Sequence, residues 1–180
     1  MAAKTSVFYL TESLAADTAG VDVTDTIDLG AYVDVADRQG ILVHSVDFVW
    51  QGQNATGDWE PLHTTLNGNG NGTIQLTDLN RGSMVFADDR ALVASGQLSF
   101  DFTNIQQTTG SDLYPDNFGP TSAQGGRIVI NDQMYCRARW TGAIDANKAV
   151  RCTVRVACSV ITLSQKDFMA IALQSTAADN

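Results

Sequence analysis

The strongest constraint on this 180-residue chain is a strict alternation of side-chain character between positions 150 and 160. The even positions carry Val150, Cys152, Val154, Val156, Cys158 and Val160, whereas Arg151, Thr153, Arg155, Ala157 and Ser159 occupy the odd ones. Successive side chains of a β-strand point to opposite faces. The pattern therefore predicts one long strand with one buried face.

The same period of two recurs elsewhere. In Gln133–Trp140 the even positions face inward, in Gln97–Thr103 the inward side chains are Leu98, Phe100 and Phe102, and Ile41–Trp50 is apolar on both faces, as a central strand would be. Further strand candidates are Ser6–Leu10, Thr26–Val35, Thr73–Thr77, Ser83–Ala87 and Arg127–Asn131. A total of roughly eight to ten strands predicts an all-β sandwich or barrel.

Helix signals are confined to the end of the chain and to one ambiguous segment. Ser164 and Asp167 have the spacing of a capping box, so we expect a short helix over Ser164–Gln174. Its apolar stripe, with Phe168 and Ile171, would dock on the protein's own sheet or on a neighbouring subunit. Asp88–Ser95 fits a strand or a short capped helix that ends at Gly96, and we favour the helix.

The chain length, and a sequence in which no interdomain linker is apparent, predict a single domain over residues 1–180. Two long loops interrupt the strands, at about 51–72 and 105–126. The first contains an Asn-Gly run at 67–72, which we interpret as a flexible turn. Loops of this length are usually functional or disordered, so we expect both to be exposed contact surfaces.

The net charge and the short apolar runs argue against several functions. The chain has 11 Lys and Arg against 20 Asp and Glu, a net charge of −9, which argues against general nucleic-acid binding. The longest apolar run, Phe168–Leu173, is too short for a helix to cross a bilayer. The early run Val7–Leu10 is too short for a signal peptide, so we expect no secretory targeting.

Catalytic and metal-binding patterns are weak. His44 and His63 are the only histidines, and neither stands in a known catalytic motif, so we expect no enzymatic activity and no cofactor. Three cysteines without CxxC spacing are interpreted as small buried apolar residues. Five aspartates lie between 22 and 37, but alternation along strands would scatter them, so we interpret them as solvated surface acids rather than a calcium site.

The arginines are more informative. If residues 142–148 turn a hairpin, then one outward face carries four arginines: Arg137, Arg139, Arg151 and Arg155. Four like charges on two strands repel each other unless something neutralises them. Local pairing, for example with Asp101, or plain solvation is the simplest interpretation. A neighbouring subunit, an anionic lipid head group and nucleic acid are the alternatives.

Together, the alternating strands, the two long loops, the late strand pair and the closing segment Ser164–Gln174 resemble a viral jelly-roll capsid protein of the single jelly-roll type. The resemblance is architectural and spans most of the chain. It implies a jelly-roll-like antiparallel β-sandwich with one short C-terminal helix. It also implies a structural shell subunit, located in the virion, that self-assembles through its sheet and loop surfaces.

The N-terminal region narrows this resemblance. Many capsid proteins that package nucleic acid carry a basic arm, whereas residues 1–40 contain only Lys4 and Arg38 against seven acids, so we expect no direct nucleic-acid binding. The chain looks more like a subunit of a tailless virus with an internal membrane, or a head-decoration protein. Expected partners are copies of itself, other capsid subunits or that membrane.

Two other classes stay open, since jelly rolls also serve lectins and enzymes. A carbohydrate-binding module would use Trp59, Tyr114 or Phe118 as a platform for sugar rings. An enzyme on this scaffold would hold a metal with histidine and carboxylates. As candidate interface residues we take Arg137, Arg139, Arg151, Arg155, Phe168 and Ile171.

Overall fold

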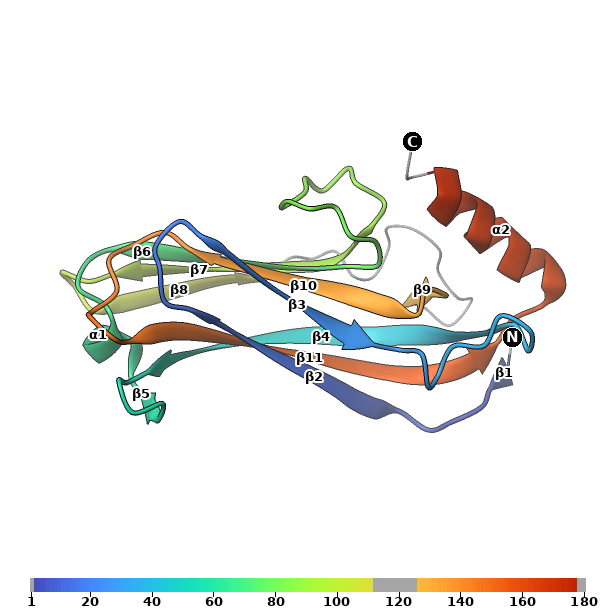
Figure 1. The fold of residues 1–180 in the computed structure, drawn as a ribbon, viewed down its shortest axis with the longest axis horizontal. Coiled ribbons are helices and arrows are strands. Elements are labelled where there is room, and N and C mark those ends of the chain that lie inside the picture. Colours follow the sequence, from blue (N-terminus) through green and yellow to red (C-terminus); the bar gives the residue numbers. More distant parts are fainter. Residues whose placement is uncertain (1, 112–125, 178–180) are drawn as a thin grey trace.

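The computed structural model describes residues 2–111 and 126–177, which form two antiparallel sheets packed face to face (Figure 1). The strands are β1 (Ala2–Ala3), β2 (Phe8–Ala16), β3 (Asp22–Asp28), β4 (Gln39–Gln53), β5 (Trp59–Glu60), β6 (Gly70–Thr77), β7 (Leu92–Asp101), β8 (Gln106–Ser111), β9 (Arg127–Val129), β10 (Gln133–Trp140) and β11 (Ala149–Thr162). The helices are α1 (Leu62–Thr65) and α2 (Gln165–Ala177). No helix in the described residues is long and apolar enough to cross a membrane.

The strand order is that of a jelly roll. One sheet runs β2–β11–β4–β9, with the short β1 and β5 added to β11 and β4, and the other runs β3–β10–β6–β7–β8. Without β1, β5 and β8, the first strand pairs with the last (β2 with β11), the second with the seventh (β3 with β10), the third with the sixth (β4 with β9) and the fourth with the fifth (β6 with β7). This nested pairing is one long hairpin wrapped into two sheets, so the predicted all-β jelly-roll sandwich is confirmed.

The core lies between the sheets. From Val150 to Val160, the even positions of β11 are at most 5 % exposed, as predicted, and they pack with inward side chains of β4, β6 and β10. All three cysteines are buried and free, which confirms their interpretation as apolar core residues. Burial raises the pKa of the Cys136 thiol to about 12, so the neutral thiol form predominates at neutral pH.

Two tryptophans fill the end of the core near α1. The rings of Trp50 and Trp140 lie 6.2 Å apart, and each packs on backbone where a glycine leaves room. A Cβ atom at Gly70 would lie 2.5 Å from Trp140, and one at Gly72 would lie 2.6 Å from Trp50. The run at 67–72 is therefore not only a flexible turn: its last three residues begin β6, and two of its glycines make close packing possible.

Several predicted elements differ from the structure. Asp88–Ser95 is not a helix, because Leu92 begins β7 and the Leu92, Val93 and Ala94 side chains are all buried; the preceding residues only turn, with Asp89 accepting a hydrogen bond from the amide of Ala91. Ser83–Ala87 is irregular rather than a strand, and β3 already ends at Asp28.

The predicted loops are also shorter than expected. In the region 51–72, β4 continues to Gln53, β5 and α1 follow, and β6 begins at Gly70. In the region 105–126, β8 occupies Gln106–Ser111, and the rest of that predicted loop lies outside the described residues up to position 125. Short strands and one helical turn lie there among glycines and polar residues.

The C-terminal helix forms as its capping signal predicts. Ser164 Oγ accepts a hydrogen bond from the Asp167 amide at 3.2 Å and donates one to Asp167 Oδ2 at 2.7 Å. Phe168 and Ile171 are buried against Leu42, Ile128 and Ile161 of the protein's own sheet. Of the two partners predicted for this stripe, the structure shows the protein's own sheet. Met169 and Leu173 are large apolar side chains of α2 that stay exposed.

A buried ion pair joins the two sheets beside β9. Arg127 is 2 % exposed and reaches Asp78, with Nη2 2.8 Å from Oδ2. Its guanidinium also donates to the carbonyl oxygens of Arg90 and Leu92 at the start of β7. Burial raises the pKa of the Asp78 carboxyl, and the Arg127 charge opposes that shift. The pair ties β9 in one sheet to the end of β6 and the start of β7 in the other.

We predict that Arg127→Met lowers the free energy of unfolding by about 3–5 kcal/mol, because Asp78 would be left as a buried charge without its cation. Urea denaturation measures this loss. Lys4→Met is the matched control, since Lys4 forms an exposed pair with Asp37 at 3.9 Å and should cost less than about 1 kcal/mol. Equal effects of the two substitutions would contradict a structural role for the buried pair.

Candidate functional site

The structure separates the four predicted interface arginines into two pairs. β10 and β11 belong to different sheets, so Arg137 and Arg139 lie on one outer face of the sandwich and Arg151 and Arg155 on the other. The prediction of a hairpin at residues 142–148 is wrong, because β10 and β11 do not pair with each other. The segment instead crosses between the sheets, held to the residues around α1 by backbone hydrogen bonds from Asp145 to Thr65 and from Asn67 to Ala143.

On the outer face of β10, one aspartate serves two arginines. Asp22 of β3 accepts a hydrogen bond from Arg139 Nε at 2.5 Å and one from Arg137 Nη1 at 3.4 Å. The Arg139 hydrogen bond is the largest cause that lowers the pKa of the Asp22 carboxyl below 3.8. The predicted partner Asp101 instead accepts hydrogen bonds from Thr103 and Asn104 in its own turn.

The arginines of β11 have no carboxylate partner in the described residues. Arg151 donates to Ser13 Oγ and to Gln53 Oε1, each at 3.2 Å. The Arg155 guanidinium lies 5.6 Å from the ring centroid of Tyr9, a cation–π distance. Among the described residues, this outer face therefore carries two guanidinium groups without a carboxylate at ion-pair distance, although the whole chain is acidic.

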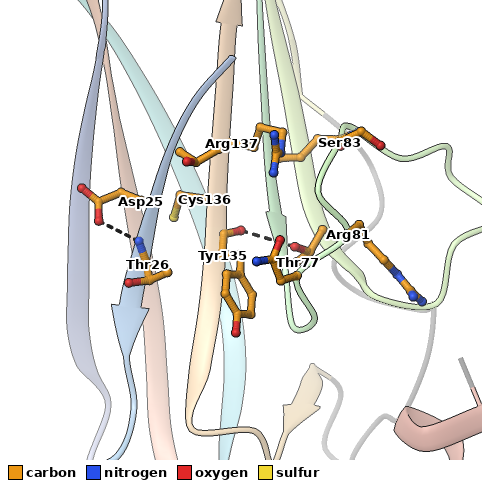
Figure 2. A pocket seen from close by; sticks show the side chains of 11 residues that line it. Asp25, Thr26, Thr77, Arg81, Ser83, Tyr135, Cys136 and Arg137 are labelled. Carbon is orange, nitrogen blue, oxygen red and sulfur yellow. Dashed lines mark hydrogen bonds between the residues drawn. The ribbon is translucent and has the colours of Figure 1, made fainter. Parts of the chain in front are cut away.

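A polar pocket of about 270 Å³ lies beside Arg137, and no sequence pattern predicts it (Figure 2). Its floor is the outer face of β3, β10 and β6, and its wall is the segment that follows β6. The lining residues are Thr24, Asp25, Thr26, Gln75, Thr77, Asn80, Arg81, Ser83, Tyr135, Cys136 and Arg137. Outward threonines on β3 and β6 are visible in the sequence, but the segment that stands over them is not.

Hydrogen bonds fix the pocket wall. Gln75 donates through Nε2 to the Val85 carbonyl at 2.7 Å and accepts from the Val85 amide through Oε1 at 2.8 Å. Thr77 Oγ1 donates to the Leu79 carbonyl at 2.9 Å, and Arg81 pairs with Asp89 at 3.1 Å. The wall is thus held in place before any ligand arrives.

A second hollow, of about 290 Å³, lies at the opposite end of the molecule from α2, near α1 and β5 (Figure 1). It is lined by Trp50, Gln51, Gly52, Trp59, Glu60, Pro61, Leu62, His63, Phe100, Ile105 and Gln107. The Trp59 and Ile105 side chains are 65 % and 64 % exposed. Of the three aromatic residues expected to form a sugar platform, Trp59 lines this hollow, whereas Tyr114 and Phe118 lie outside the described residues.

The histidines and the aspartate cluster are not brought together. His44 in β4 is hydrogen-bonded through Nε2 to Ser159 Oγ at 2.9 Å, and His63 lies in α1. Within residues 2–111 and 126–177, no group of three or more His, Cys, Asp or Glu could hold a metal ion.

The comparisons with known proteins add little sequence information. No protein-family model matches the chain, and no curated protein matches it. A solved structure titled Desmodium yellow mottle tymovirus resembles it with a TM-score of 0.32 and 5 % sequence identity, over 89 % of this chain and 91 % of that one. The jelly-roll assignment rests on the strand pairing of this chain itself.

The ion pairs of Asp22 with Arg137 and Arg139 predict how the stability of the fold depends on pH. The folded-state pKa of Asp22 is lowered, so its contribution to stability is present above pH 3.8 and is lost as the pH falls toward the lowered value. Thermal melts of wild type and Asp22→Asn should differ by a constant amount at neutral pH, with wild type more stable. The difference should shrink below about pH 4. A difference that persists unchanged to about pH 2 argues against this ion pair as its source.

Proposed function

We propose that the protein is a structural subunit of a virion shell that associates with copies of itself. The proposal assigns the chain a structural role rather than a catalytic one. The jelly-roll topology supports it, since this architecture builds viral capsids as well as lectins and enzymes. Because the fold serves several functions, the surface of this chain has to carry the argument.

The loop end near α1 is the first surface that supports association. Trp59 and Ile105 flank the hollow described above, and the partly buried Trp50 and the buried Leu62 and Phe100 also line it. Exposed apolar surface around a hollow marks a contact site more often than isolated exposed residues do. Aromatic anchors of this kind also dominate the binding energy of protein interfaces.

The backbone at Ile105 is the observation that carries the proposal. Ile105 has a φ of 51°, a left-handed conformation that is strained for a β-branched residue. Glycine or asparagine is the usual residue where a hairpin turn needs this conformation. The strain costs of order 1–3 kcal/mol, and the isoleucine side chain still faces solvent. This turn therefore lowers the stability of the monomer while its apolar side chain remains exposed. A neighbouring subunit that buries the side chain would explain both features.

The face of β11 supplies a second contact. Arg151 and Arg155 have no carboxylate at ion-pair distance in the part of the chain that the structure describes, and each copy carries a net charge of −9, so a neighbouring copy can provide the carboxylates. We assign this face to subunit contacts, with another capsid subunit or an anionic internal membrane as the alternative occupant. Direct nucleic-acid binding is not part of the proposal, because the N-terminal region is acidic.

One specific observation favours a second function. The Trp59 indole is 65 % exposed beside a hollow, which is the arrangement that a carbohydrate-binding module uses to stack a sugar ring. The two functions differ in what Ile105 does. A sugar platform on Trp59 depends little on the neighbouring turn, whereas a subunit contact depends on both side chains.

We predict that Ile105→Asn has two opposite effects. The monomer should become more stable by about 1 kcal/mol, because asparagine tolerates the left-handed backbone. Self-association should weaken by about tenfold or more, because an apolar anchor is lost. Thermal melts and sedimentation velocity over a range of concentrations measure the two effects.

Ile105→Val is the matched control, since it keeps both the strain and the apolar surface, and it should change both quantities little. If Ile105→Asn associates as strongly as wild type, the loop end is not the contact. Association that is lost together with monomer stability would point to damaged folding rather than to a lost contact.

A further inference from the structure

The pocket of Figure 2 contains hydroxyl groups that the protein itself does not use. The hydroxyls of Thr24, Thr26 and Ser83 make no hydrogen bond to the described residues, although all three line the pocket. Apart from Cys136, which is fully buried, the residues that line the pocket have polar or charged side chains. Such a pocket suits a ligand rich in hydroxyl groups rather than an apolar one.

The charge balance of the pocket is positive on the side of Arg137. Asp22 is shared between Arg137 and Arg139 and bonds Arg139 at the shorter distance, so one carboxylate faces two guanidinium groups. Arg137 makes one hydrogen bond within the described residues, at 3.4 Å, and a guanidinium has five N–H donors. It therefore retains donors for an anionic group, and a guanidinium matches a planar carboxylate well.

The other charged groups of the pocket do not cancel this effect. Arg81 is paired with Asp89, so it adds no net charge. Asp25 belongs to the boundary, but its Oδ1 accepts a hydrogen bond from the amide of Thr26 at 2.7 Å, and Figure 2 shows its carboxylate pointing away from Arg81 and Ser83. Arg137 is thus the cation that a bound anion would meet.

We propose that this pocket binds an acidic saccharide, a sugar ring that carries a carboxylate. The carboxylate binds Arg137, and the ring hydroxyls bind Thr24, Thr26 and Ser83. The wall, clamped by Gln75 on Val85, is in place before binding, so little ordering is required. This site lies apart from the Trp59 hollow, shares no lining residue with it, and does not depend on the proposed shell function.

Saturation-transfer NMR on the purified full chain tests the proposal, and it works whether or not the protein assembles. Glucuronic acid is the probe, glucose is the neutral control with the same ring, and acetate is the carboxylate without a ring. We expect saturable binding of glucuronate, with glucose and acetate each at least about tenfold weaker. No binding of glucuronate, or equal binding of either control, overturns the assignment.

Matched variants locate the site. Arg137→Gln should weaken glucuronate binding by about tenfold or more, because the cation in the pocket is lost. Arg155→Gln removes a cation on the opposite outer face of the sandwich and leaves the Asp22 ion pairs intact, so glucuronate binding should change by less than about twofold. Thr24→Val keeps the shape and charge of the pocket but removes one hydroxyl. It should weaken the binding of glucuronate and leave the weak binding of acetate unchanged.

Thermal melts identify any variant that fails to fold. If Arg137→Gln does not fold, the loss of glucuronate binding in Thr24→Val tests the site instead. Equal effects of Arg137→Gln and Arg155→Gln would overturn the proposal, because they would show that the overall charge of the protein, and not the pocket, attracts the acid. Unchanged glucuronate binding in both Arg137→Gln and Thr24→Val would overturn it as well.

Discussion

The strand β11 organises the sandwich, because it pairs with β2 on one side and with β4 on the other while its even-numbered side chains enter the core. Burial of that one face fixes the register of both neighbours, since a shift by one residue would turn the apolar set outward. The side chains of Arg151 and Arg155, on the odd-numbered face, then point away from the core. The same alternation thus determines both the core and one of the two surfaces that we assign to subunit contacts.

The two ends of the sandwich are closed by different means. At one end α2 covers Leu42, Ile128 and Ile161, so this apolar surface is already buried within the chain. At the other end Trp50 and Trp140 pack on the glycines of β6 and leave room for the hollow beside Trp59. Trp59 and Ile105 stay exposed at that end beside buried apolar side chains, and this is the surface to which we assign the subunit contact.

The sequence predicted what periodicity determines and missed what depends on three-dimensional neighbours. The alternating strands, the buried cysteines and the cap of α2 followed from local patterns. The partner of Arg137 did not, because Asp22 is 115 residues away in the chain and meets it only through the pairing of β3 with β10. The pocket beside Arg137 was invisible for the same reason: its wall is an irregular segment held by Gln75, and no local pattern predicts that contact.

The central claim is that this jelly roll is built to associate with copies of itself. The mass of the purified protein, measured by light scattering over a wide range of concentration and salt and combined with negative-stain images, tests that claim most directly. The account predicts a closed particle or ring of uniform mass, a fixed multiple of the 19.3 kDa chain. A species that stays at 19.3 kDa at high concentration under every salt condition would contradict it.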